Sequence, residues 1–176
     1  MQYKCQPTSR KKLKSLAIEF RKKFGVNQLV FPVFEIIDNL YNDGLINLLI
    51  LDDTDSKLKK DELALYELSS NTMYLKLSVY EEAVNNVGRS RFTLTHELSH
   101  YLLLYVLKFN LIETTDEIKT YEDPEWQANY LAGELLAPEK LTKDFTVDDY
   151  MNKCLLSEEC SIVLWDKRRK DKWYGK

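Results

Sequence analysis

The chain has 176 residues, a formal net charge of −3 at pH 7, and a composition that is 44% hydrophobic and 30% charged. These values are typical of a folded globular chain and exclude a disordered one, so we expect a single domain over residues 1–176. The five glycines are too widely spaced for a phosphate-binding loop, a dinucleotide-binding fingerprint or a Gly-x-Ser-x-Gly elbow, which excludes the enzyme classes that depend on those motifs.

The first half of the chain predicts two helices followed by three strands. Apolar residues recur at helical spacing over residues 8–24 and again over residues 32–42. Residues 46–51, 62–68 and 72–77 have the patterns and boundaries of strands. Because these three strands are short and follow one another along the chain, we expect them to form a small sheet.

The second half of the chain predicts mainly helices. A strongly apolar helical pattern runs from Arg89 to about Phe109, and a second helix begins near Pro124 and ends before Pro138. Residues 141–176 predict a short helical extension. Together with the three strands, this succession of elements predicts an α+β fold.

Both ends of the chain are basic, over residues 1–24 and 167–176. A basic arm at each end can contact nucleic acid or an acidic partner. Runs of charge are more often solvated helix faces and frayed tails. We prefer the second explanation, and therefore do not expect direct DNA binding.

Several features of the sequence predict a cytoplasmic location. No apolar run approaches the roughly 18 residues that a membrane span needs, and no apolar segment typical of a secretory signal follows the first residues. Cys5, Cys154 and Cys160 lack paired spacing, which favours reduced thiols over disulfides or a cysteine-based zinc site. We therefore expect a protein of a reducing compartment that does not contact a membrane.

The most informative segment is a His-Glu-x-x-His sequence formed by His96, Glu97 and His100 within the helical pattern. Residues four apart lie on one face of a helix, so the two histidines can present ring nitrogens to a single metal ion. Glu97 then lies beside the metal without having to bind it, where a carboxylate can accept a proton from a water polarised by Zn²⁺. The segment therefore predicts a zinc-dependent hydrolytic site.

An alternative explanation is a pair of histidines whose hydrogen bonds are satisfied on a buried helix face. These are the only two histidines in the chain. Random placement of two histidines and a glutamate gives this spacing in about one chain in a thousand, so we prefer the metal site.

Catalytic zinc sites normally have three protein ligands and leave the fourth position to water. Glu125, which follows Pro124 at the start of the second long helix, is the best third ligand in the sequence. Asn129 follows one turn later on the same face and can hydrogen-bond a metal-binding histidine. Glu122 and Glu134 are alternative ligands, and Glu125 could instead be an ordinary glutamate favoured by the helix dipole.

Two blocks of the sequence together resemble the signature of the ImmA/IrrE metallopeptidases. The first block is Arg91 to Leu103, and the second runs from Glu125 to Pro138 with the pattern Glu-x-x-Ala-Asn-x-x-Ala-x-Glu-Leu-Leu-x-Pro. The resemblance covers roughly residues 30–140. It implies a zincin-like core of the gluzincin type, in which a small three-stranded sheet packs on the His-Glu-x-x-His helix and a second helix carries a ligand.

The resemblance also implies a site and a function. Zn²⁺ would be bound by His96, His100 and Glu125, and Glu97 would be the general base. Members of the family are bacterial and phage zinc proteins implicated in cleaving helix-turn-helix repressors. The implied partner is therefore a repressor protein, whose cleavage would derepress a mobile element or stress genes.

A peptidase also needs a place for its substrate and a stabiliser for the oxyanion. We expect the substrate peptide to add as a strand to the edge of the small sheet, with residues 72–77 as that edge. Because the motif uses both histidines, the oxyanion donor has to be a tyrosine or an arginine. The eleven tyrosines, together with Arg89 and Arg91, all remain open for this role.

A function of a different class also fits these residues. A zinc-binding regulator could dock to a repressor or to DNA without proteolysis, and the basic ends of the chain would support that activity. A third possibility is a plain structural helical protein, which predicts no zinc in the purified material.

Overall fold

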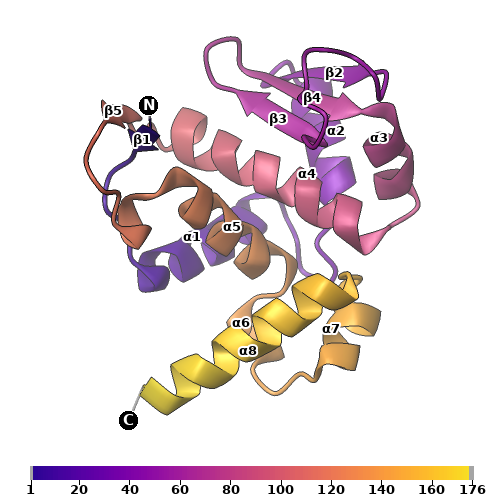
Figure 1. The fold of residues 1–176 in the computed structure, drawn as a ribbon. Coiled ribbons are helices and arrows are strands. Elements are labelled where there is room, and N and C mark those ends of the chain that lie inside the picture. The colour runs from indigo at the N-terminus through magenta and orange to yellow at the C-terminus, as the bar shows by residue number, and fades with distance from the viewer. Residues whose placement is uncertain (1, 175–176) are drawn as a thin grey trace.

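The computed structural model describes residues 2–174 (Figure 1). A three-stranded sheet lies on one side of helix α4 (Gly88–His100), and α1 (Arg10–Lys23) and α5 (Pro124–Leu136) lie on its other side. The remaining C-terminal helices form a group beyond α5 (Figure 1). This is a mixed α+β architecture, as the sequence predicts. Positions 175–176 of the basic C-terminal segment lie outside the described residues.

The remaining elements complete these layers. The other helices are α2 (Val33–Asn42), α3 (Leu77–Val84), α6 (Glu139–Thr142), α7 (Val147–Cys154) and α8 (Glu158–Tyr174). The strands are β1 (Gln2–Lys4), β2 (Asn47–Leu51), β3 (Ala64–Glu67), β4 (Thr72–Lys76) and β5 (Ile112–Thr114). The two predicted N-terminal helices are confirmed as α1 and α2, and the three predicted strands as β2, β3 and β4.

Helix α1 begins and packs as its sequence predicts. The Ser9 side chain caps it by accepting a hydrogen bond from the Lys12 N–H at 3.2 Å. Its apolar face is buried, and Arg21 at its last turn is also buried, where the guanidinium donates to the main-chain oxygen of Leu135. Arg21, one of the basic residues of the N-terminal segment, therefore joins α1 to the end of α5 and does not face solvent.

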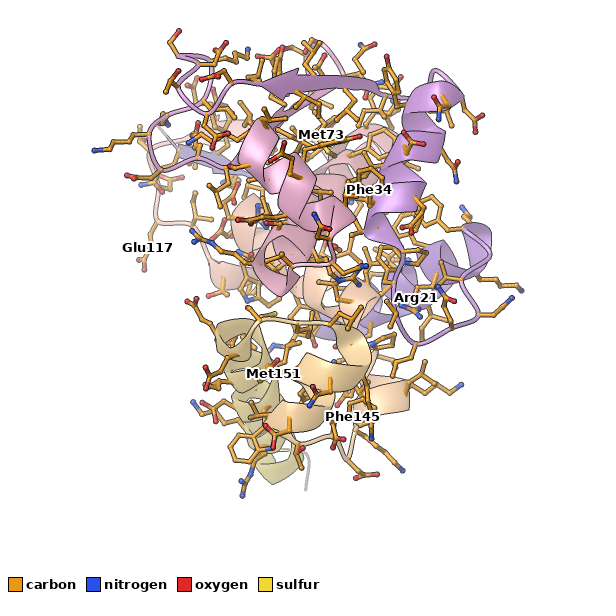
Figure 2. The ribbon with its side chains drawn as sticks, turned by 90° about the vertical axis from the view of Figure 1, so that its right-hand side faces the viewer. Arg21, Phe34, Met73, Glu117, Phe145 and Met151 are labelled. Carbon is orange, nitrogen blue, oxygen red and sulfur yellow. The ribbon has the colours of Figure 1, made fainter. Side chains whose placement is uncertain are left out.

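The strand order of the small sheet is β2-β4-β3. Strand β4 pairs with β2 in parallel, with Leu49 opposite Tyr74, and with β3 antiparallel, with Met73 opposite Tyr66. Met73 is fully buried and lies just beneath the sheet in the rotated view (Figure 2). Strand β4 is thus central, and the prediction that residues 72–77 form the edge is wrong. Periodicity along a strand gives its faces but not its neighbours, because strand order is set by pairing between distant segments.

Three further features of the fold differ from the sequence prediction. The predicted helix of residues 89–109 consists of α4 followed by a π-helical segment at Tyr101–Val106. Helix α3 begins at Leu77, where a strand was expected to end. Strand β1 pairs with β5 in a separate two-stranded ribbon. Apolar spacing does not distinguish a turn of α-helix from a turn of π-helix. Strands of three residues are too short to show alternation.

The C-terminal helices are joined to the core by a buried arginine of α8. The Arg168 guanidinium donates to Tyr150 Oη at 2.7 Å and to the main-chain oxygen of Ala137, and lies 3.4 Å from Glu134 Oε1. Phe145 and Met151 mark the same group of helices in the rotated view (Figure 2). A residue of the basic C-terminal segment is therefore part of the interior.

Two further observations concern the cysteines and the apolar character of the helices. Cys5, Cys154 and Cys160 are all free thiols, as predicted. Over residues 2–174, none of the helices is both long enough and apolar enough to span a bilayer.

The Arg168 contacts predict a large effect on stability. In Arg168→Met, the carboxylate of Glu134 stays buried without its cation, so we expect the free energy of unfolding to fall by about 3–5 kcal/mol. Urea denaturation followed by circular dichroism measures this change. The matched control is Arg169→Met, because Arg169 is exposed and lies over the Trp165 ring, a contact worth roughly 0.5–1 kcal/mol. Equal losses in the two variants would contradict the structural role of Arg168.

Candidate metal centre

The two histidines of the His-Glu-x-x-His sequence lie one turn apart on α4 and point at a common partner. Their Nε2 atoms are 3.0 Å apart. His96 Nε2 lies 3.2 Å from Glu125 Oε2, and His100 Nε2 lies 3.3 Å from Glu125 Oε1. The ligand atoms of these three side chains all fall within 4.8 Å of one another, so the group could hold a metal ion.

Glu125 is placed by the start of α5. Pro124 occupies the first turn of the helix, and the Asp123 side chain caps it by accepting the Glu125 N–H at 2.9 Å. The hydrogen bonds from His100 and His96 hold the pKa of Glu125 far below its ordinary value, against the opposing effect of burial. The carboxylate is therefore ionised and available as a ligand.

The second nitrogen of His96 is held by Asn129. His96 Nδ1 lies 3.0 Å from Asn129 Oδ1, one turn beyond Glu125 on α5. Because an amide oxygen can only accept, Nδ1 carries a hydrogen, so in the neutral ring Nε2 is left with the lone pair that a metal ion would bind. This is the tautomer that a metal ligand requires, and it is fixed by a contact of the kind found behind metal-binding histidines.

The spacing of the three donors fits a small tetrahedral ion. Ligands about 2.0–2.1 Å from a tetrahedral centre lie roughly 3.3–3.4 Å from one another. The observed separations of 3.0, 3.2 and 3.3 Å are close to this value. Two imidazoles and one carboxylate also leave one coordination position open.

Glu97 lies beside the cluster and is not part of it. Its side chain is buried, and Oε2 accepts the main-chain N–H of Tyr66 on β3 at 2.6 Å. Burial raises the pKa of Glu97 above its ordinary value, and the nearby His100 and His96 partly oppose that rise. The carboxylate is therefore a better proton acceptor than an exposed glutamate.

A cleft of about 410 Å³ opens onto these residues. One wall is β3, through Ala64, Leu65 and Tyr66, and the lining also includes Tyr3 of β1 and Pro124. Tyr66 N–H points away from β4, because it bonds Glu97 on α4. Alternate residues of an antiparallel strand direct their main-chain groups to the same side, so Ala64 and Tyr66 present theirs at the free edge of the sheet.

The other acidic residues considered from sequence lie elsewhere. Within the described part of the chain, neither Glu122 nor Glu134 belongs to the metal-binding group. Glu134 is buried beside Arg168 and accepts the Glu139 N–H at 3.0 Å.

Neither of the two arginines proposed for the oxyanion lines this cleft. Arg91 is buried and donates to the main-chain oxygen of Phe31 at 2.8 Å and to Asn86 Oδ1 at 3.1 Å. Arg89 lines a different cavity, with Trp126 of α5 and Leu164 of α8.

Two residues of the cleft were not identified from sequence. Tyr3 was not singled out, and the main-chain N–H of Tyr66 belongs to a strand whose position at the edge was not foreseen. Neither residue carries a local signal, because both reach the cleft through pairing of distant segments.

A family model described as the IrrE N-terminal-like domain, a peptidase family, matches residues 48–151. The matched segment contains α4 and α5, and therefore all three residues of the group that could hold a metal ion. The chain has no significant match among curated proteins or among solved structures.

The contact between His96 and Asn129 predicts an effect on metal affinity. In Asn129→Ala, the imidazole loses the partner that fixes its tautomer, so we expect the affinity for Zn²⁺ to fall about 10- to 100-fold. Competition with a fluorescent zinc chelator measures the affinity. Asn42→Ala, at an exposed position of α2, is the control and should bind Zn²⁺ like the unmodified chain. Unchanged affinity in Asn129→Ala would show that Asn129 does not support the ligand.

Proposed function

The chain belongs to the ImmA/IrrE family of metallopeptidases, and on that premise we propose that it is a zinc-dependent endopeptidase that cleaves a helix-turn-helix transcriptional repressor. The observation that carries this proposal is the convergence of His96, His100 and Glu125 on one point beside the buried carboxylate of Glu97. Family membership supports the peptidase chemistry, and the resemblance of the two sequence blocks supports the repressor as substrate.

His96, His100 and Glu125 would hold the metal. Nitrogen and carboxylate donors in a group of three are the set used by catalytic zinc sites. Zinc bound there would supply Lewis acidity, which polarises a water molecule and the carbonyl to be attacked. Asn129 would keep the His96 ring in the tautomer that exposes its Nε2 lone pair.

Glu97 would act as the general base. Its carboxylate accepts a proton from the water that attacks the scissile carbonyl, and then delivers that proton to the nitrogen of the leaving amine. Burial raises the pKa of Glu97 toward neutral pH. A pKa near the working pH suits a group that first accepts a proton and then donates it.

The substrate would lie along β3, the strand that borders the cleft. The main-chain groups of Ala64 and Tyr66 that point away from β4 can pair with an extended peptide by strand addition. A substrate carbonyl that accepts the Tyr66 N–H competes with Glu97 for that donor. Binding of the peptide would therefore release the Glu97 carboxylate toward the attacking water.

The proposed substrate sets the expected cellular context. A repressor is a cytoplasmic protein, so the enzyme is expected in the cytoplasm and has no need of a membrane. Cleavage within a segment that can become extended would inactivate the repressor and derepress a mobile element or stress genes. Direct DNA binding has reduced support, because Arg21 and Arg168 of the two basic ends are buried in the protein.

Glu97→Gln tests this function. The amide keeps the size of the side chain but cannot accept the proton, so we expect bound zinc to be retained and the rate of cleavage to fall at least about 100-fold. The assay incubates the protein, with and without Zn²⁺, with a candidate helix-turn-helix repressor chosen from the products of neighbouring genes, and maps the fragments by mass spectrometry. Glu81→Gln, at an exposed position of α3, is the matched control.

Two results would count against the proposal. Cleavage by Glu97→Gln at the unmodified rate would remove Glu97 from the mechanism. An unchanged effect on repression in cells, despite lost cleavage, would favour a regulator that docks to the repressor without proteolysis.

A further inference from the structure

We propose that Tyr3 is a catalytic residue, whose hydroxyl donates the hydrogen bond that stabilises the oxyanion of the scissile peptide. This inference rests on the proposed peptidase function and assigns to one side chain a role that the sequence leaves open. When water attacks a peptide carbonyl, negative charge develops on its oxygen, and a donor already aimed at that oxygen lowers the barrier.

Tyr3 lies where such a donor is needed. It lines the same cleft as His96, Glu97 and His100. It also lines the adjoining hollow, together with Glu125. The residue is 51% exposed, and its hydroxyl has no hydrogen bond to any other residue among those described. A ring at the mouth of the cleft with an unused hydroxyl can therefore donate to a bound substrate.

The N-terminal segment is fixed against the same part of the chain that positions Glu125. Tyr3 pairs with Glu113 of β5. Two residues later, the Cys5 N–H donates to the main-chain oxygen of Glu122 at 2.8 Å. The Gln127 side chain on α5 then donates to the main-chain oxygen of Gln6 at 2.9 Å. These bonds hold β1 beside the segment that leads into α5, so the same part of the chain positions Tyr3 and Glu125.

Among the described residues, no other side chain that lines the cleft offers a free hydroxyl. The Tyr66 hydroxyl is already donated to Asn71 Oδ1 at 2.9 Å. The Nε2 atoms of His96 and His100 face Glu125, and His96 Nδ1 faces Asn129. The remaining side chains that line the cleft, within the described residues, are carboxylates or apolar. Tyr3 is therefore the only lining side chain there with a hydroxyl free to donate.

The chemistry of a phenol suits this role. A neutral hydroxyl can donate to the developing oxyanion while keeping its proton, so it does not compete with Glu97 for the proton of the attacking water. Tyr3 lies outside the 48–151 segment that the family model matches. The assignment therefore concerns a part of this chain that the family match does not describe.

The experiment compares zinc-loaded wild type with Tyr3→Phe, Tyr3→Ala, Tyr41→Phe and Glu97→Gln. Tyr41 is exposed on α2, and its variant loses one phenol hydroxyl away from the cleft. The first measurement is kcat and KM on fluorescently labelled, unfolded casein, with bound zinc quantified in each protein. The second is the dissociation constant of N-phosphoryl-Leu-Trp, measured by calorimetry, because its tetrahedral phosphoryl oxygens imitate the attacked carbonyl.

Loss of the Tyr3 hydroxyl should act on the transition state and not on the ground state. We expect Tyr3→Phe to lower kcat about 100-fold or more with little change in KM, zinc content or thermal stability. The affinity for N-phosphoryl-Leu-Trp should fall by a similar factor. Tyr3→Ala should match Tyr3→Phe, because only the hydroxyl is used, and Tyr41→Phe should match wild type.

The assignment would be overturned if Tyr3→Phe and wild type gave the same results in both measurements. That includes the case in which neither protein cleaves casein or binds N-phosphoryl-Leu-Trp. Impairment of Tyr3→Ala alone would also overturn it, because that result indicates packing by the ring. If Glu97→Gln is inactive while Tyr3→Phe keeps the wild-type kcat, only the role of Tyr3 fails. If Glu97→Gln is as active as wild type, the proposed function itself fails.

Discussion

The arrangement of this molecule depends on the packing of α4 against α5. Each helix alone carries part of the candidate metal-binding group, with two imidazoles on α4 and one carboxylate at the start of α5. Buried leucines of both helices belong to one core, among them Leu94 and Leu131, and this core fixes the separation of the helices. The three donors consequently lie within hydrogen-bonding distance of one another. Displacement of α5 would separate the ligands and also move Asn129 away from His96.

The sheet contributes to the same centre through its edge. Strand β3 presents the Tyr66 N–H to Glu97, so the strand that would receive a substrate also holds the proposed base. In the proposed mechanism, the Tyr66 N–H couples the docking of a peptide to the release of the Glu97 carboxylate. The β1–β5 ribbon adds a third element, because it contributes Tyr3 to the lining of the cleft. The proposed chemistry thus draws on four segments, and only two of them carry the ligands.

Sequence alone predicts the parts of this arrangement that depend on local spacing. His96 and His100 share a helix face, so their convergence follows from helical geometry. Glu125 and Asn129 contact them from the helix that begins at Pro124. Strand order and the position of Tyr3 could not be predicted in this way. Both depend on pairing across long stretches of chain, such as Tyr3 with Glu113, and periodicity within a strand does not encode its partner.

The most direct test of the central claim is the location of zinc by anomalous X-ray diffraction from crystals grown with Zn²⁺. The account predicts one strong peak within bonding distance, about 2.0–2.2 Å, of His96 Nε2, His100 Nε2 and a carboxylate oxygen of Glu125. A zinc ion bound elsewhere, with these three side chains turned away from one another, would contradict it.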